Sequence, residues 1–195
     1  DMFVKNRALA KEYVGKRVAS PLVNMHDGAD ATLSAASYFF DDDGVLASDT
    51  LIIKDGILQT GISDVISASI LGTKPTGNGR RESYKRKAYT RMTNTFFSPG
   101  EDKVEDMIKS IKHGYLLAQT DNGMEDPKNW NIQCVCAYGR EIKDGQFTGK
   151  IVEPVVMSGY VPDLLNSITM VSDTCTVIGS GHCGKGYKEW VMVSD

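Results

Sequence analysis

A histidine and a cysteine, His182 and Cys183, are adjacent in the glycine-rich stretch GSGHCGKGYKEW, residues 179–190. Glycines allow a backbone to turn sharply or to approach a ligand closely. The positive charges of Lys185 and Lys188 favour the thiolate, the form of cysteine that ligates metals or attacks substrates. The spacing alone leaves three alternatives open for Cys183: a nucleophile, a metal ligand, or an incidental cysteine in a tight turn.

The other histidines and cysteines do not form a recognisable catalytic or metal-binding pattern. Neither His26 nor His113 has a histidine partner at helical spacing, so the chain contains no HExxH-type zinc pair. The four cysteines match neither a disulfide framework nor a CxxC zinc pattern. Cys134 and Cys136 fall on a predicted strand, where we expect both to be buried, small apolar residues. Reduced thiols are typical of the cytoplasm, which is the predicted location.

A second candidate site is the basic segment 80–91, in which six Lys and Arg residues stand against Glu82. Its net charge of +5 leaves -8 for the rest of the chain, because the whole chain carries -3. Such a concentration of charge can attract phosphate or a peptide carboxylate. The alternative, a solvated loop that pairs with acidic neighbours, is favoured because aromatic residues are sparse and no nucleic-acid motif is present. The acidic triplet 41–43 is expected to form a turn exposed to water.

The elements that must position these residues predict an α+β fold, mostly antiparallel sheet with a few short helices. The Asp55-Gly56 pair between two apolar runs predicts a hairpin over residues 50–62. Ser63 is expected to cap the helix that follows it. The remaining predicted elements are helices over 2–16, 101–114 and near Pro162, a hairpin turning at 143–145, and strands over 17–27, 92–98, 167–179 and 189–194, the last two on either side of the loop that holds Cys183.

Size and composition set the remaining limits. A chain of 195 residues with 41% apolar and 24% charged residues fits one globular domain, or at most two small ones. Its net charge of -3 gives no general attraction for nucleic acid or for an anionic membrane surface. No apolar run approaches the roughly 20 residues that a membrane-spanning helix needs. No signal peptide is apparent, and we expect the chain to be a piece of a longer protein.

Three stretches together resemble one known family. They are PTGNGRRESY at 75–84, RMTNTFFSPGE at 91–101 and GHCGKG at 181–186. They are similar to the C-terminal domain of the TldD/PmbA family, zinc metallopeptidases of the cytoplasm formerly described as modulators of DNA gyrase. The stretch LIIKDGILQTGISD at 51–64 is similar to the hairpin that precedes the Thr-Gly-Asn-Gly-Arg segment of the family. The resemblance covers most of the chain, which is therefore expected to be the C-terminal domain over 1–195.

The resemblance implies a specific zinc chemistry. In active subunits of the family, an HExxxH helix supplies two histidine ligands and a glutamate, and a cysteine in a Gly-x-Cys-Gly-Lys loop supplies the third ligand. Cys183 stands in that position. The glutamate acts as the general base on a water that zinc activates for attack on a peptide carbonyl. The HExxxH helix is absent from this sequence and is expected just upstream of Asp1. This chain alone is therefore expected to be inactive and to bind zinc weakly or not at all.

The same resemblance suggests partners and further site residues. Arg80, Arg81 and His182 are candidates for substrate binding, although the two arginines could instead hold their loop. The expected substrate is an extended or unfolded peptide, bound by strand addition to a sheet edge. The intact protein is expected to form a homodimer, or a heterodimer with a related subunit. Two other functions stay open: a non-catalytic partner subunit or peptide-binding scaffold of the same family, and nucleic-acid binding through residues 80–91.

Overall fold

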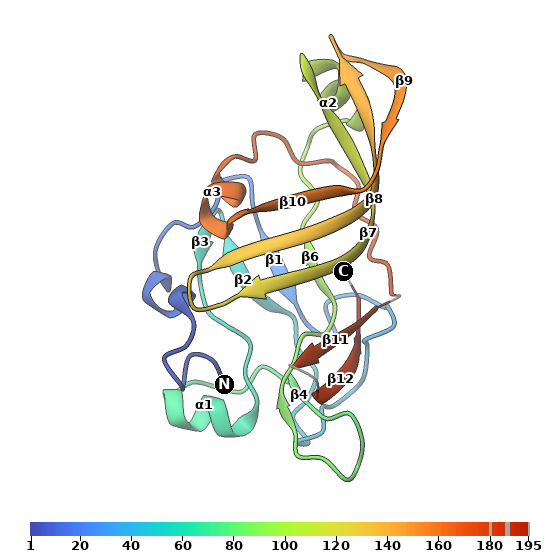
Figure 1. The fold of residues 1–195 in the computed structure, drawn as a ribbon. Coiled ribbons are helices and arrows are strands. Elements are labelled where there is room, and N and C mark those ends of the chain that lie inside the picture. Colours follow the sequence, from blue (N-terminus) through green and yellow to red (C-terminus); the bar gives the residue numbers. More distant parts are fainter. Residues whose placement is uncertain (180, 186–187, 195) are drawn as a thin grey trace.

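The computed structural model describes residues 1–179, 181–185 and 188–194. Within these ranges it has the predicted α+β architecture, with antiparallel sheets and short helices (Figure 1). The helical elements are the 3-10 helix η1 (Leu9–Tyr13) and the α-helices α1 (Val65–Leu71), α2 (Val104–Ser110) and α3 (Val161–Asn166). None of the helices in the described ranges is long and apolar enough to cross a membrane.

The first sheet contains four antiparallel strands in the order β3-β2-β1-β6. Their bounds are β1 (Met25–Asp27), β2 (Thr50–Lys54), β3 (Ile57–Leu58) and β6 (Thr95–Phe97). The predicted hairpin joins β2 to β3, and Asp55 and Gly56 form its turn with φ angles of 49° and 77°. Two left-handed residues in succession are what a two-residue hairpin turn requires, which explains the Asp-Gly pair at this point.

The second sheet is a long, curved ribbon that crosses in front of the first sheet in Figure 1. Its strands are β7 (His113–Asp126), β8 (Asn131–Lys143), β9 (Gln146–Val152) and β10 (Val155–Tyr160). β8 pairs with β7 along its length, with β10 near its start and with β9 near its end. The predicted turn at 143–145 is confirmed. Cys134 and Cys136 both lie on β8, where Cys136 is buried as predicted and Cys134 only partly so.

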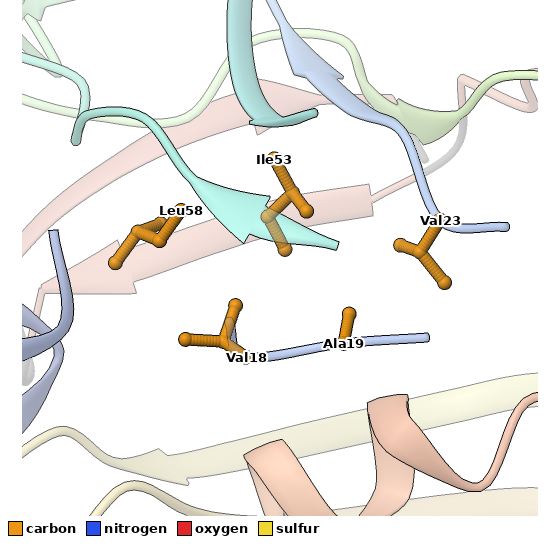
Figure 2. Close-up of a cluster of buried hydrophobic side chains, with 5 residues drawn as sticks. All are labelled: Val18, Ala19, Val23, Ile53 and Leu58. Carbon is orange, nitrogen blue, oxygen red and sulfur yellow. The ribbon is translucent and has the colours of Figure 1, made fainter. Parts of the chain in front are cut away.

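The hydrophobic core lies between these two sheets. Its central cluster consists of Val18, Ala19, Val23, Ile53 and Leu58, which point toward one another in Figure 2. Trp130 from the β7–β8 turn and Leu165 from α3 pack against it. Burying one large aliphatic side chain contributes about 1.5–3 kcal/mol. Packing in this core therefore holds the long ribbon and α3 against the first sheet.

Two predictions near the start of the chain are wrong. The predicted helix over 2–16 is reduced to η1, because Asn6 adopts a left-handed conformation with φ 51° that interrupts helical backbone. The cap of α1 is Asp64 rather than Ser63. The Asp64 carboxylate accepts a hydrogen bond from the Ser67 backbone N–H at 2.6 Å. Aspartate is as good a cap as serine. The sequence pattern therefore predicts the helix correctly but places its cap one residue too early.

Two further predictions, in the second half of the chain, also need correction. The helix expected over 101–114 ends at Ser110, because β7 begins at His113 and pairs from there with β8. The strand expected over 167–179 does not form. In that stretch the described structure has only an isolated bridge, between Asp102 and Ser172. The strand predicted over 92–98 is confirmed by β6, whereas that over 17–27 is confirmed only at its end, by β1.

Replacing Gly56 with alanine should destabilise the chain by about 3 kcal/mol or more. The left-handed φ costs an alanine about 1–2 kcal/mol, and the added Cβ would also clash with the backbone carbonyl oxygens of Ala19 and Ser20. Gly44 is a matched control, because its φ is 79° and its Cβ would meet nothing within 4 Å. Urea unfolding should show the larger loss for Gly56→Ala. Equal losses in the two variants would contradict the steric explanation.

Candidate functional site

Cys183 lies on a strand rather than in the open glycine loop that the sequence predicted. The two strands involved are β11 (Gly181–Lys185) and β12 (Lys188–Val193). They pair antiparallel, with Cys183 opposite Val191. The strand predicted over 189–194 is confirmed by β12, and residues 186 and 187 lie outside the described residues. The backbone of Cys183 is therefore fixed by strand pairing, which a loop would not provide.

The two faces of this hairpin differ in burial. The odd-numbered positions of β12, 189 to 193, are buried, whereas Trp190 and Met192 are 48% and 45% exposed. Cys183, opposite Val191, belongs to the inner face and is partly buried, whereas His182, opposite Met192, is exposed. Successive side chains of a strand point to opposite faces. The two residues that the sequence places side by side are thus separated, and a substrate contact by His182 stays a prediction.

The inner face brings Cys183 against the end of the basic segment. The Arg91 Nη2 donates a hydrogen bond to the Cys183 Sγ over 2.8 Å, although the two residues are 92 positions apart. Arg91 follows β5 (Tyr89–Thr90), which pairs with β4 (Gly79–Arg80), and these strands lie next to the β11–β12 hairpin in Figure 1. The contact places the positive charge of the guanidinium directly beside the sulfur. The sequence counted Arg91 only as one charge among six.

Lys185, which the sequence proposed as the cation beside the thiol, is engaged elsewhere. Its Nζ forms an ion pair with the Asp1 carboxylate at 2.6 Å and lies 5.1 Å above the ring of Tyr89. Burial lowers the pKa of Lys185, and the nearby positive charge of Arg91 lowers it further. The side chain of Lys188 lies outside the described structure. Arg91 is therefore the cation that contacts Cys183 within the described residues.

A buried carboxylate joins the segment that carries Arg91 to the segment that carries Asn78. Asp27, at the end of β1, is 2% exposed and accepts four hydrogen bonds. One comes from Asn78 Nδ2 at 2.6 Å, two from the backbone N–H and hydroxyl of Thr93, and one from the hydroxyl of Thr95. Asn78 in turn binds both the backbone N–H and the carbonyl of Arg91. Asp27 thus joins the TGNGR and RMTN segments, a role that the sequence did not indicate.

Arg80 and Arg81 both make contacts that hold their loop. Arg80 donates to the Met92 carbonyl at 2.6 Å and stacks 5.5 Å above the ring of Tyr38. Burial lowers the pKa of Arg80. Arg81 forms an ion pair with Asp42 at 3.1 Å, and its backbone N–H donates to the same carboxylate. These contacts agree with the expected pairing of the basic segment with acidic neighbours, and substrate binding by the two arginines stays a prediction.

The acidic turn 41–43 is less exposed than the sequence suggested. Asp41 is only 4% exposed, because its carboxylate accepts backbone N–H bonds from Asp43, Val45 and Gly79. Backbone donors satisfy a buried carboxylate as water would. The turn therefore supports β4 at the edge of the site, and the expectation of a fully solvated turn is wrong for Asp41.

The donor chemistry of this site fits zinc, but only in part. Thiolate sulfur is a common zinc ligand in proteins, and Cys183 presents a partly buried sulfur on a fixed strand. A catalytic zinc site needs three protein ligands, however. Across residues 1–179, 181–185 and 188–194, no three His, Cys, Asp or Glu side chains are grouped so that they could hold a metal. Within the described residues, Cys183 therefore offers a single donor of the kind that zinc takes, and not a complete zinc site.

Two known metalloproteases are similar in sequence to most of this chain. A metalloprotease TldD homologue of Haemophilus influenzae is 33% identical over 182 residues, covering 93% of this chain and 38% of that protein. A zinc metalloprotease TldD homologue of Saccharolobus solfataricus is 32% identical over 175 residues, covering 87% of this chain and 38% of that protein. The chain thus spans about two fifths of the length of these relatives.

Solved structures show the same fold. The structure of TldE from Thermococcus kodakarensis matches with a TM-score of 0.76 and 24% identity, covering 99% of this chain and 42% of that one. A Thermotoga maritima protein described as a candidate modulator of a DNA gyrase matches with a TM-score of 0.75 and 23% identity, covering 98% and 42%. The family model of the PmbA/TldA metallopeptidase C-terminal domain matches residues 1–193. This chain therefore belongs to the PmbA/TldA metallopeptidase family.

Proposed function

We propose that the full-length protein containing this chain is a zinc-dependent peptidase in which Cys183 is one of the zinc ligands. The observation that carries the proposal is the contact between Cys183 Sγ and Arg91 Nη2 on the inner face of the β11–β12 hairpin. It holds a sulfur atom at a defined position beside a positive charge. The names of the relatives, metalloprotease and zinc metalloprotease, support the same chemistry. Zinc, when bound, activates water and polarises the carbonyl group to be attacked.

The other ligands are proposed to come from an HExxxH helix upstream of Asp1. The ion pair between Asp1 and Lys185 supports this proposal. Lys185 lies on the same strand as Cys183, two residues after it, so the ion pair holds residue 1 close to that strand. A helix ending shortly before Asp1 would therefore reach the inner face of the hairpin. Its two histidines would complete the ligand set, and its glutamate would act as the general base. By itself this chain should be inactive and should bind zinc weakly.

The proposed substrate is an extended peptide that adds as a strand beside Cys183. Among the described residues, β11 pairs only with β12, so its other edge presents backbone N–H and C=O groups that a peptide can bind. Backbone pairing selects extended chains with little dependence on side chains, which suits unfolded peptides as substrates. We also propose that the full-length protein acts as a dimer, with itself or with a related subunit.

Removal and restoration of zinc test the proposed function. In the full-length protein, a chelator should abolish cleavage of an unfolded peptide, and stoichiometric zinc should restore it. The 195-residue chain should show no cleavage under the same conditions, because it holds a single zinc ligand. Metal content by mass spectrometry should fall and recover with the activity. Cleavage that persists in chelated, metal-free protein would overturn the proposal.

A further inference from the structure

We propose that Arg91 is a positioning residue for zinc: its guanidinium holds the Cys183 sulfur in the direction that the metal requires. This inference rests on the proposed zinc-ligand role of Cys183. A residue behind a metal ligand often fixes the orientation of that ligand, and its loss typically weakens metal binding by about 10–100-fold. Nothing in the sequence pairs the two residues, because 92 positions separate them.

The position of Arg91 is set by the buried network and not by the sulfur. Asn78 forms hydrogen bonds with both the backbone N–H and the backbone carbonyl of Arg91. Asn78 is fully buried and also donates a hydrogen bond to Asp27. The arginine is 8% exposed, so its long side chain has little freedom to move. A cysteine side chain on a strand can adopt more than one rotamer. The Arg91 guanidinium is therefore a fixed donor, and its hydrogen bond selects one rotamer of Cys183.

A second observation points to a site that is still incomplete. The Nε of Arg91 is buried and has no hydrogen-bond partner in the described part of the chain. Buried donors are nearly always paired, because leaving one unpaired costs about 1–3 kcal/mol. An unpaired donor on the same guanidinium that contacts the ligand sulfur is expected if a group outside the described residues completes the site.

The planar shape of the guanidinium matters as well as its charge. An arginine presents several N–H donors in a fixed fork, whereas a lysine is a point charge on a flexible stem. Lysine at position 91 would keep the charge near Cys183 but would not define the direction of the sulfur. Methionine would keep most of the apolar stem and remove every donor. These two substitutions separate charge, direction and packing.

Zinc affinity of the full-length protein tests the inference. We expect Arg91→Met to weaken zinc binding by about 10–100-fold in competition with a chromophoric chelator, and Arg91→Lys to give a smaller loss. With cobalt in place of zinc, the sulfur-to-metal charge-transfer band should be weaker or shifted in Arg91→Met. Arg140→Gln is the matched control, because Arg140 is an exposed residue of β8 that stacks on the ring of Phe147. It should leave both the affinity and the band unchanged.

The possible results separate this inference from the proposed function. Parental zinc affinity and an unchanged cobalt band in Arg91→Met would overturn the role of Arg91 while leaving Cys183 as a ligand. Parental affinity in Cys183→Ser would instead overturn the ligand role on which the inference depends. A lower melting temperature with an unchanged band would indicate a structural role only, and would also overturn it. If Arg91→Met does not fold, the band and affinity of Arg91→Lys decide by the same criteria.

Discussion

Replacing Asp27 with alanine should destabilise the chain by about 4 kcal/mol or more, the largest loss of stability that we expect from one substitution. The carboxylate accepts four hydrogen bonds, from Asn78, Thr93 and Thr95, and lies at 2% exposure. Hydrogen bonds to a charged group contribute about 1.5–3 kcal/mol each, although such values do not simply add. Alanine would also leave these donors buried without an acceptor, which is one of the mechanisms behind exceptionally large losses.

Urea unfolding of the 195-residue chain measures this effect, with Asp42→Ala as the control. Asp42 is also a carboxylate that pairs with a residue of the basic segment. Its ion pair with Arg81 is exposed, however, with both side chains at 37%. Exposed ion pairs contribute about 0–1 kcal/mol, so the control should lose little. Asp27→Asn should fall between the two, because the amide keeps the volume but offers only one acceptor oxygen. A loss for Asp27→Ala no greater than the control would show that the network is dispensable.

The milder substitution, Asp27→Asn, should also make the Cys183 thiol more accessible. Asp27 holds Asn78, and Asn78 holds the backbone of Arg91, so the chain of contacts ends at Cys183 Sγ. In Asp27→Asn that remains folded, alkylation of Cys183 should be faster than in the parent chain. Alkylation of Cys175, which is exposed and not part of this chain of contacts, provides the internal reference.

Local chemistry made some elements predictable. Asp55-Gly56 and the turn at 143–145 were identified because an Asp-Gly pair adopts the left-handed conformations that a tight hairpin needs, and both pairs do so. The central part of α2 is predictable because its apolar residues recur at helical spacing. These signals depend only on residues a few positions apart, which is why they survive in a single sequence. The predicted end of α2 failed where β7, paired with the distant β8, took over the chain.

The candidate site could not be predicted in the same way, because its contacts are long-range. Asp27 meets Asn78 and Thr93 across 51 and 66 positions, and Arg91 meets Cys183 across 92. No periodicity in the sequence encodes such pairs. The family resemblance singled out the segments TGNGR, RMTN and GHCGK, which hydrogen bonds link in the structure, but it did not assign a role to Asp27. Residue spacing alone leaves three roles open for Cys183: a nucleophile, a metal ligand or an incidental thiol.

Replacing Cys183 with alanine in the full-length protein should lower zinc affinity by more than about 100-fold and reduce peptide cleavage to background. Loss of a residue behind a ligand already costs about 10–100-fold, so loss of a ligand itself should cost more. In the proposed mechanism the remaining ligands would hold the metal too weakly to support cleavage. Zinc content after gel filtration and turnover of an unfolded peptide measure the two effects. Unchanged zinc content together with unchanged turnover would remove Cys183 from the metal site.

The neighbouring residue provides the sharpest control. His182 is adjacent in sequence, but strand geometry places it on the exposed face of the hairpin, opposite Met192. His182→Ala should therefore retain zinc at the parental level. If His182 contacts the substrate as predicted, the His182→Ala substitution should raise KM while the zinc content stays constant. Loss of zinc in His182→Ala with retention in Cys183→Ala would reverse the assignment of the two faces, since only the inner face lies against Arg91.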